Sequence, residues 1–236
     1  MTVPFSEFRR ARAVIFDFDG VIADTEWLHS DTFRKVLEEE GIRITPEDHD
    51  RRFLGINDRA GFALAFEDAG RALESGEVVR LVERKSVYYG ARIEEIRPFP
   101  GAAELVRALA ARGPLAIASG GRRHEIEAIL IANGLRRDFR AILSADDVAR
   151  SKPDPEGMLL AFEALRAEES GRWSDLEPAE CLVIEDSLPG IDAAHAAGMR
   201  CVAVAHTYPR ERLGGADRVV ERIADLRAEE VIERKR

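Results

Sequence analysis

Short apolar runs alternate with longer stretches of helical periodicity along most of the chain. Five runs have the length and residue types of buried strands: 14–16, 115–119, 141–144, 181–185 and 201–205. Helical stretches 102–112, 123–133, 156–168 and 190–197 lie between them, with Gly113, Gly134 and Gly198 at the expected C-caps. This alternation predicts an α/β fold, a Rossmann-like parallel sheet with helices on both faces.

Residues 25–97 interrupt this alternation directly after the first predicted strand and its loop. They show helical periodicity over 27–39, 59–69 and 78–96 and contain no convincing strand. The segment Pro98-Phe99-Pro100-Gly101 is a stiff, turn-prone linker that leads the chain back to the α/β core. The pattern predicts an α/β core of residues 1–24 and 98–236 and an inserted all-helical cap of residues 25–97, joined by two connections able to act as hinges.

Two carboxylates follow the first predicted strand, in the run Asp17-Phe18-Asp19-Gly20. Residues two apart on an extended chain share a face, so both acids reach one site at the carboxyl end of the strand. Like charges this close repel each other unless a metal ion or a shared proton compensates, which favours a functional site. An ordinary Asp-x-Asp-Gly turn is the alternative, because Asp and Gly are common turn residues.

Two later segments at the ends of strands also carry candidate chemistry. Ser119-Gly120 ends the second predicted strand and opens a helix, which offers a hydroxyl and free N–H groups to an anion. Such a loop is also a common turn. Lys152, one of only four lysines in the chain, stands before two prolines that fix its backbone ahead of the next helix. A solvated surface lysine does not need a backbone fixed in this way, so we interpret Lys152 as functional.

Glu185 and Asp186 end the apolar run 181–185 and complete an oxygen-rich set with Asp17 and Asp19. Mg²⁺ suits such a set, because it binds carboxylates, carbonyls, waters and substrate phosphate. The sequence contains no His and Cys cluster of the kind that zinc prefers. These residues therefore predict a magnesium site at the strand ends.

Taken in order, these segments resemble the four motifs of the haloacid dehalogenase superfamily, and the resemblance covers essentially the whole chain. The helical insertion between the first two motifs resembles the cap of the β-phosphoglucomutase-like and sugar-phosphatase-like branch. The matching residues are Asp17-Phe18-Asp19-Gly20, Ser119, Lys152 and Glu185-Asp186.

The resemblance implies a role for each of these residues. Asp17 would be the nucleophile that takes the phosphoryl group as an aspartyl-phosphate, and Asp19 would be the general acid and base. The Asp17 carboxylate, the main-chain carbonyl of Asp19 and Asp186 would hold Mg²⁺, with Glu185 as a ligand or a supporting residue. The transferring phosphoryl oxygens would be bound by Ser119, Gly120 and Lys152.

The expected activity is Mg²⁺-dependent hydrolysis of a small organic phosphate monoester, with a sugar phosphate as the favoured class. Dehalogenation needs neither Asp19 nor a metal in this family, so the retained residues argue against it. A β-phosphoglucomutase-type mutase is the alternative, because His29 and Lys85 match its cap histidine and lysine. Where that mutase carries an arginine for a second phosphate, this chain has Asp58, with Arg59 one residue later, which favours hydrolysis.

Substrate choice is expected to lie with the cap. We predict that His29, Lys85 and Arg59 bind substrate, although His29 could also be a polar helix residue and Lys85 part of a solvated face. No catalytic role is predicted for residues 205–209, which form the last loop before a final strand, and His206 is expected to be structural. The further candidates for substrate contact are Arg52, Asn57, Tyr89 and Arg122.

A net charge of −9 argues against a general nucleic-acid or acidic-membrane surface. The chain also lacks an apolar leader and any run of membrane-spanning length. We expect a cytoplasmic monomer that binds a small phosphorylated metabolite, with neither nucleic acid nor membrane as a partner. A non-enzymatic phosphate-sensing or partner-binding protein on the same scaffold is the second class considered, and the retained Asp19 argues against it.

Overall fold

The chain divides into two compact units in a computed structural model that describes residues 10–53, 56–167 and 171–233. The first, called here the core domain, comprises Met1–Asp24 and Arg97–Arg236, and the second, the cap domain, is Thr25–Ile96. The sequence-based division placed Arg97 with the inserted region, one residue further along the chain.

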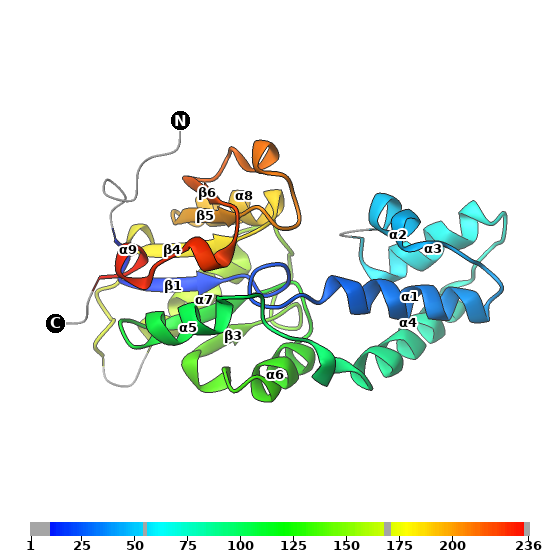
Figure 1. The fold of residues 1–236 in the computed structure, drawn as a ribbon, viewed down its shortest axis with the longest axis horizontal. Helices are drawn as coiled ribbons and strands as arrows, with labels where there is room; N and C mark the ends of the chain where they lie inside the picture. Colours follow the sequence, from blue (N-terminus) through cyan, green and yellow to red (C-terminus); the bar gives the residue numbers. More distant parts are fainter. Residues whose placement is uncertain (1–9, 54–55, 168–170, 234–236) are drawn as a thin grey trace. The chain divides into compact units, whose positions relative to one another are not determined.

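The core domain is built on a six-stranded sheet in the order β3-β2-β1-β4-β5-β6 (Figure 1). All five neighbouring pairs are parallel, so the carboxyl ends of the strands lie at one edge. The chain adds strands on one side of β1 and then crosses to the other, and ligands bind at such a switch point. The strands are β1 (Ala13–Phe16), β2 (Leu115–Ala118), β3 (Ala141–Leu143), β4 (Cys181–Glu185), β5 (Arg200–Val204) and β6 (Arg218–Val220).

Helices cover both faces of this sheet, which is why every residue of β1 is buried. Met158 and Phe162 of α7 and Ile191 of α8 pack in one apolar cluster with Ile15 and Val183. The helices of the core domain are α5 (Ala102–Ala110), α6 (Arg123–Ala132), α7 (Glu156–Arg166), α8 (Leu188–Ala196) and α9 (Ala228–Val231). Short 3-10 helices occupy Arg136–Asp138, Pro178–Glu180, Arg210–Leu213 and Ile223–Asp225.

The regular secondary structure of the described cap residues is all helical, and the domain has an apolar centre that includes Phe33, Leu37, Phe62 and Leu81. Its helices are α1 (Glu26–Glu39), α2 (Pro46–Arg52), α3 (Asp58–Asp68) and α4 (Ser75–Gly90), followed by a 3-10 helix at Ile93–Glu95. In the described part of the chain, no helix combines the length and apolar character needed to cross a membrane.

Three predicted helix ends need correction. Residues 78–96 were predicted as one helix, but α4 ends at Gly90. The predicted end of α7 at Glu168 lies outside the described residues, and the helix ends at Arg166. Gly134 and Gly198 have the left-handed φ expected of C-caps, whereas Gly113 does not. Gly113 is instead required by packing, because a Cβ there would lie 2.7 Å from the carbonyl oxygen of Arg12.

Candidate active site

The centre of the site is Lys152, which joins the ends of two neighbouring strands. Its Nζ donates hydrogen bonds to Oδ1 of Asp17 at 2.5 Å and to Oε1 of Glu185 at 2.6 Å. Asp17 follows β1 and Glu185 ends β4, while Lys152 lies in the loop before α7. Glu185 is fully buried and Asp17 is only 6% exposed, so this ion-paired trio lies within the sheet edge rather than on a solvated surface.

Glu185 is fixed on both of its oxygens. Besides Lys152 on Oε1, its Oε2 accepts from the backbone N–H of Asp186 and Ser187, both at 2.7 Å, and from Oγ of Ser187 at 2.8 Å. A Cβ at Gly190 would lie 1.7 Å from Oε1, so only glycine fits beside this carboxylate. Glu185 was predicted to be either a metal ligand or a supporting residue, and these contacts favour the supporting role.

The charges at these strand ends do not balance. Burial, and then the carboxylates of Glu185, Asp186 and Asp19, raise the pKa of Asp17 well above its usual range. Burial and Glu185 likewise raise the pKa of Asp186 to about 7. Burial alone would lower the pKa of Lys152, but Asp17 and Glu185 raise it and keep the ammonium charged. One cation therefore faces more negative charge than it neutralises.

The carboxylates at these strand ends are partly suited to binding a hard dication. Among the described residues, no group of three or more His, Cys, Asp or Glu side chains is arranged to hold a metal ion. Lys152 engages carboxylate oxygens of Asp17 and Glu185, two of the four residues predicted to hold the metal. The all-oxygen donors and the excess negative charge still suit Mg²⁺, which needs only one or two carboxylates beside carbonyls, waters and phosphate.

Ser119 and Gly120 stand next to this cluster at the end of β2. Oγ of Ser119 donates to Oδ2 of Asp19 at 3.4 Å and accepts from the N–H of Gly121 at 3.0 Å. Ser119, Gly120 and Lys152 also line one cavity of about 110 Å³. The structure thus brings together Ser119, Gly120 and Lys152, and Lys152 links them to Asp17 and Glu185.

A second polar cluster lies within the cap domain. Nζ of Lys85 is 2.5 Å from Oδ1 of Asp58 and 3.0 Å from Nδ1 of His29, and Lys85 is only 3% exposed. The ring of His29 stacks on Tyr89 at 4.4 Å. Desolvation and the Lys85 charge lower the pKa of His29 to about 3, so the imidazole is neutral at pH 7. Lys85 is therefore not on a solvated face, and its charge is matched by Asp58.

The other cap candidates are not gathered into this cluster. Arg59 is exposed, and Arg52 pairs with Asp68 through Nε at 2.6 Å. Asn57 caps α3 by accepting from the N–H of Ala60 at 3.0 Å. Arg122, in the core domain, is exposed before α6. The structure gives Arg52 and Asn57 local structural contacts that account for their presence.

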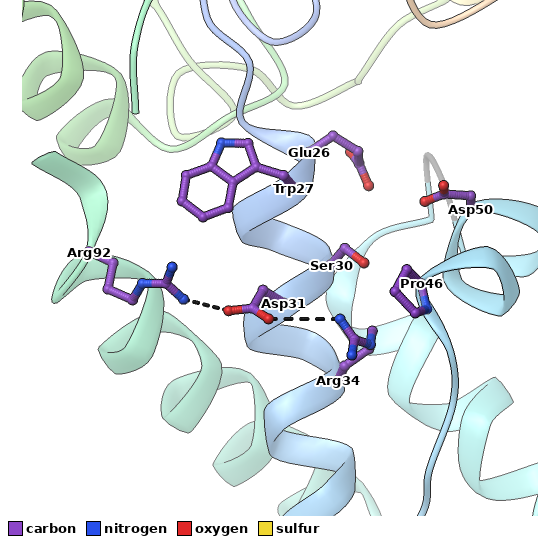
Figure 2. Close-up of a pocket in the computed structure, with 8 residues that line it drawn as sticks. All are labelled: Glu26, Trp27, Ser30, Asp31, Arg34, Pro46, Asp50 and Arg92. Atoms are coloured by element: carbon purple, nitrogen blue, oxygen red, sulfur yellow. Dashed lines mark hydrogen bonds and ion pairs between the residues drawn. The ribbon is translucent and has the colours of Figure 1, made fainter. Parts of the chain in front are cut away.

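The cap domain also contains a cavity of about 500 Å³ beside α1 (Figure 2). Asp31 lies between the guanidinium groups of Arg34 and Arg92, and pairs with both. Trp27 forms another wall, with Arg92 over its ring. Both arginines of this cavity are paired with Asp31, and the cavity includes none of the predicted site residues, so we assign it no ligand.

Thr207 was missed by the sequence analysis. Its hydroxyl donates a hydrogen bond to Oδ2 of Asp186, although no role was predicted for residues 205–209. The available signal was position, because Thr207 follows β5 at the same edge as the other site residues. The neighbouring His206 packs its ring on Phe99, with the centroids 4.0 Å apart.

This fold and this arrangement of strand-end residues define a hydrolase of known type. The family model for haloacid dehalogenase-like hydrolases matches residues 11–198, and the chain belongs to that family. It is 30% identical to the fructose-1-phosphate phosphatase of Escherichia coli over 84% of this chain and 98% of the relative. The β-phosphoglucomutase of Clostridium difficile has a similar structure, with TM-score 0.76 and 28% identity over 93% of this chain and 94% of that one.

A longer relative shows that this domain also occurs within larger proteins. The chain is 31% identical to the bifunctional riboflavin kinase/FMN phosphatase of Arabidopsis thaliana over 97% of its own length, and spans 58% of that protein. The relatives therefore include both phosphatases and a mutase.

Proposed function

We propose that this protein is a Mg²⁺-dependent phosphatase that hydrolyses a small organic phosphate monoester, with a sugar phosphate as its substrate class. The observation that carries the proposal is the contact of Lys152 with Asp17 at 2.5 Å, at the switch point of the sheet. A nucleophilic carboxylate beside a fixed cation is the arrangement that phosphoryl transfer requires, because the transferring oxygens carry the charge.

The roles of the chain's residues follow from their positions. A carboxylate oxygen of Asp17 attacks phosphorus, the bond to the leaving oxygen breaks, and the phosphoryl group stays on Asp17. Asp19 gives its proton to the leaving oxygen and then takes one from the water that attacks the phosphoryl-aspartate. Lys152, Ser119 and the backbone N–H of Gly120 hold the transferring oxygens.

Asp17, Asp186 and the main-chain carbonyl of Asp19 are the groups we propose as ligands of Mg²⁺. The ion, when bound, supplies positive charge against the transferring oxygens. Glu185 acts through Lys152 and the Ser187 loop rather than as a ligand. With Glu185 in this supporting role, Lys152 stays charged and keeps its position beside Asp17.

The cap cluster supports hydrolysis over mutase chemistry. A mutase must hold a substrate with two phosphate groups, which favours unpaired positive charge. Lys85 is instead paired with Asp58, and His29 is neutral at pH 7. Such a cluster suits hydroxyl groups of a neutral sugar. Nζ of Lys85 lies 3.0 Å from Nδ1 of His29, and these two residues match the cap lysine and histidine of the mutase. A mutase is therefore the second candidate.

The test is release of inorganic phosphate from a panel of sugar phosphates and short-chain phosphates, with and without Mg²⁺. Asp17→Asn should abolish release and leave the circular dichroism spectrum unchanged. Asp192→Asn, the same substitution on the exposed side of α8, is the matched control and should turn over like the wild type.

Two results would contradict the phosphatase proposal. Conversion of a hexose 1-phosphate to its 6-phosphate isomer, without net phosphate release, would establish the mutase. Tight binding of a sugar phosphate without turnover of any compound would indicate a binding protein instead.

A further inference from the structure

We propose that Thr207 is a positioning residue for Asp186, and that its hydroxyl sets the affinity of the site for Mg²⁺. This inference rests on the proposed function, because it takes Asp186 as a metal ligand. Thr207 lies outside the four motifs, in the loop that follows β5.

The first observation is that three strand ends meet at one point. The hydroxyl of Thr207, after β5, donates to Oδ2 of Asp186, after β4. A Cβ at Gly20, in the loop after β1, would lie 1.9 Å from the same oxygen and 2.9 Å from Oγ1 of Thr207. Gly20 has φ +77°, so glycine is needed there both for backbone conformation and for this space.

The loop that carries Thr207 is held in place by its own contacts. The N–H of Ala205 donates to the carbonyl of Val220 at 2.8 Å, and that of His206 to the carbonyl of Val204 at 2.9 Å. The His206 ring packs against Phe99. Thr207 is therefore presented by the ends of β5 and β6 and is not a freely moving surface side chain.

This geometry gives Thr207 a definite task. A carboxylate oxygen accepts several hydrogen bonds, so the Thr207 hydroxyl fixes the plane of Asp186 without occupying the whole group. Residues that orient metal ligands in this way typically contribute about 10–100-fold to metal affinity. Without the hydroxyl, Asp186 stays buried but loses its fixed orientation.

The experiment measures binding of Mg²⁺ alone by titration calorimetry, without substrate, in four proteins. Thr207→Val removes the hydroxyl at nearly constant volume and should raise the Kd for Mg²⁺ by about 10–100-fold. Thr207→Ser keeps the hydroxyl and should stay near the wild type. Tyr208→Phe removes a hydroxyl from the adjacent residue and should leave the Kd unchanged. In turnover assays, excess Mg²⁺ should restore the kcat of Thr207→Val.

An unchanged Kd in folded Thr207→Val overturns the inference, even if the wild type releases phosphate as proposed. A wild type that neither binds Mg²⁺ nor releases phosphate overturns the proposed function together with the inference. If Thr207→Val does not fold, Thr207→Ala, which only removes atoms, carries the same expectation. A loss of kcat that excess Mg²⁺ does not restore would show a role other than positioning the ligand.

Discussion

Lys152 is the residue on which the account of the site depends. It is held by two buried carboxylates from two strands, Asp17 and Glu185. Removing one partner of such a buried arrangement costs far more than an exposed ion pair is worth, because a charge is left uncompensated. The cation that we propose to face a transferring phosphoryl group is thus built into the core of the domain.

The charge of Lys85 in the cap gives a prediction about substrate choice. Asp58→Asn removes the carboxylate that matches Lys85 and leaves the cluster positive. We expect the KM for a sugar bisphosphate to fall relative to that for a monophosphate by about tenfold, the range of one charge-assisted hydrogen bond. Steady-state kinetics on matched substrates measure this ratio. Asp68→Asn removes a carboxylate paired with Arg52 and serves as the control; an equal shift there would contradict the assignment.

The core-domain residues that could be predicted from the motifs share one property: each follows a strand within a short motif. Asp17, Ser119 and Lys152 were identifiable because a strand end, a turn and a polar group occur together in the sequence. The contact of Thr207 with Asp186 was not identifiable, and neither was the pairing of Asp58 with Lys85, since both join residues distant in the sequence. A lone hydroxyl or carboxylate carries no sign of the partner it will meet.

The start of helix α8 connects fold to site, because Gly190 lies directly against Glu185. Gly190→Ala should force Glu185 away from Lys152, lower turnover by at least about tenfold and reduce the free energy of unfolding by about 1–3 kcal/mol, as overpacking does. Urea denaturation and phosphate release measure the two effects.

The control for this substitution is Gly76→Ala in α4, where the new methyl group meets no atom within 4 Å. There the better helix propensity of alanine should raise the free energy of unfolding by up to about 1 kcal/mol. Equal effects at Gly190 and Gly76 would show that contact with Glu185 is unimportant.

The loop after β3 gives a prediction about pH. Asp147 accepts from the N–H of Ser144 at 2.8 Å and pairs with Arg123 at 2.7 Å, which ties this loop to the start of α6. Burial alone would raise the pKa of Asp147, but Arg123 and Ser144 lower it to about 2. The pKa of an unfolded aspartate is about 3.9, so between these values the unfolded chain binds more protons.

The stability that Asp147 contributes is therefore present above about pH 4 and lost as the pH falls to about 2. We expect Asp147→Asn to lower the free energy of unfolding at pH 7 by about 1–3 kcal/mol. The difference from the wild type should shrink between pH 4 and pH 2 in denaturant titrations. A difference that is independent of pH would contradict this explanation.

At the level of elements, the sheet could be predicted more fully than the cap domain. Strands such as β4 are continuous apolar runs because both faces of a parallel sheet are buried. Helix α2 was not predicted, since its seven residues are polar and show no apolar periodicity. It is defined instead by its start, where Thr45 and Asp48 form a capping box and Pro46 occupies the first turn.

For the whole molecule, the excess of negative charge at the strand ends predicts how metal removal acts. Chelation should stop turnover but leave the protein folded, because Lys152 already bridges Asp17 and Glu185. Mg²⁺ at 100 times its Kd should raise the free energy of unfolding by about 2.7 kcal/mol.

Asp186→Asn separates the metal effect from general stability. It removes a buried carboxylate whose pKa is raised to about 7 by burial and Glu185, so without Mg²⁺ the variant should be at least as stable as the wild type. It should no longer gain stability from Mg²⁺. Urea denaturation with and without the ion measures both, and an undiminished gain would contradict the ligand assignment.

The proposed role of Asp17 as nucleophile is tested by finding where the phosphoryl group resides during turnover. Wild-type protein and Asp17→Asn would each be mixed with a substrate that the wild type hydrolyses. The reactions would be quenched in acid within the first turnover, and the protein digested and mapped by mass spectrometry. We expect one phosphoryl group on Asp17 in the wild type and none in the variant. A phosphoryl group on another residue, or steady phosphate release with Asp17 never modified, would contradict it.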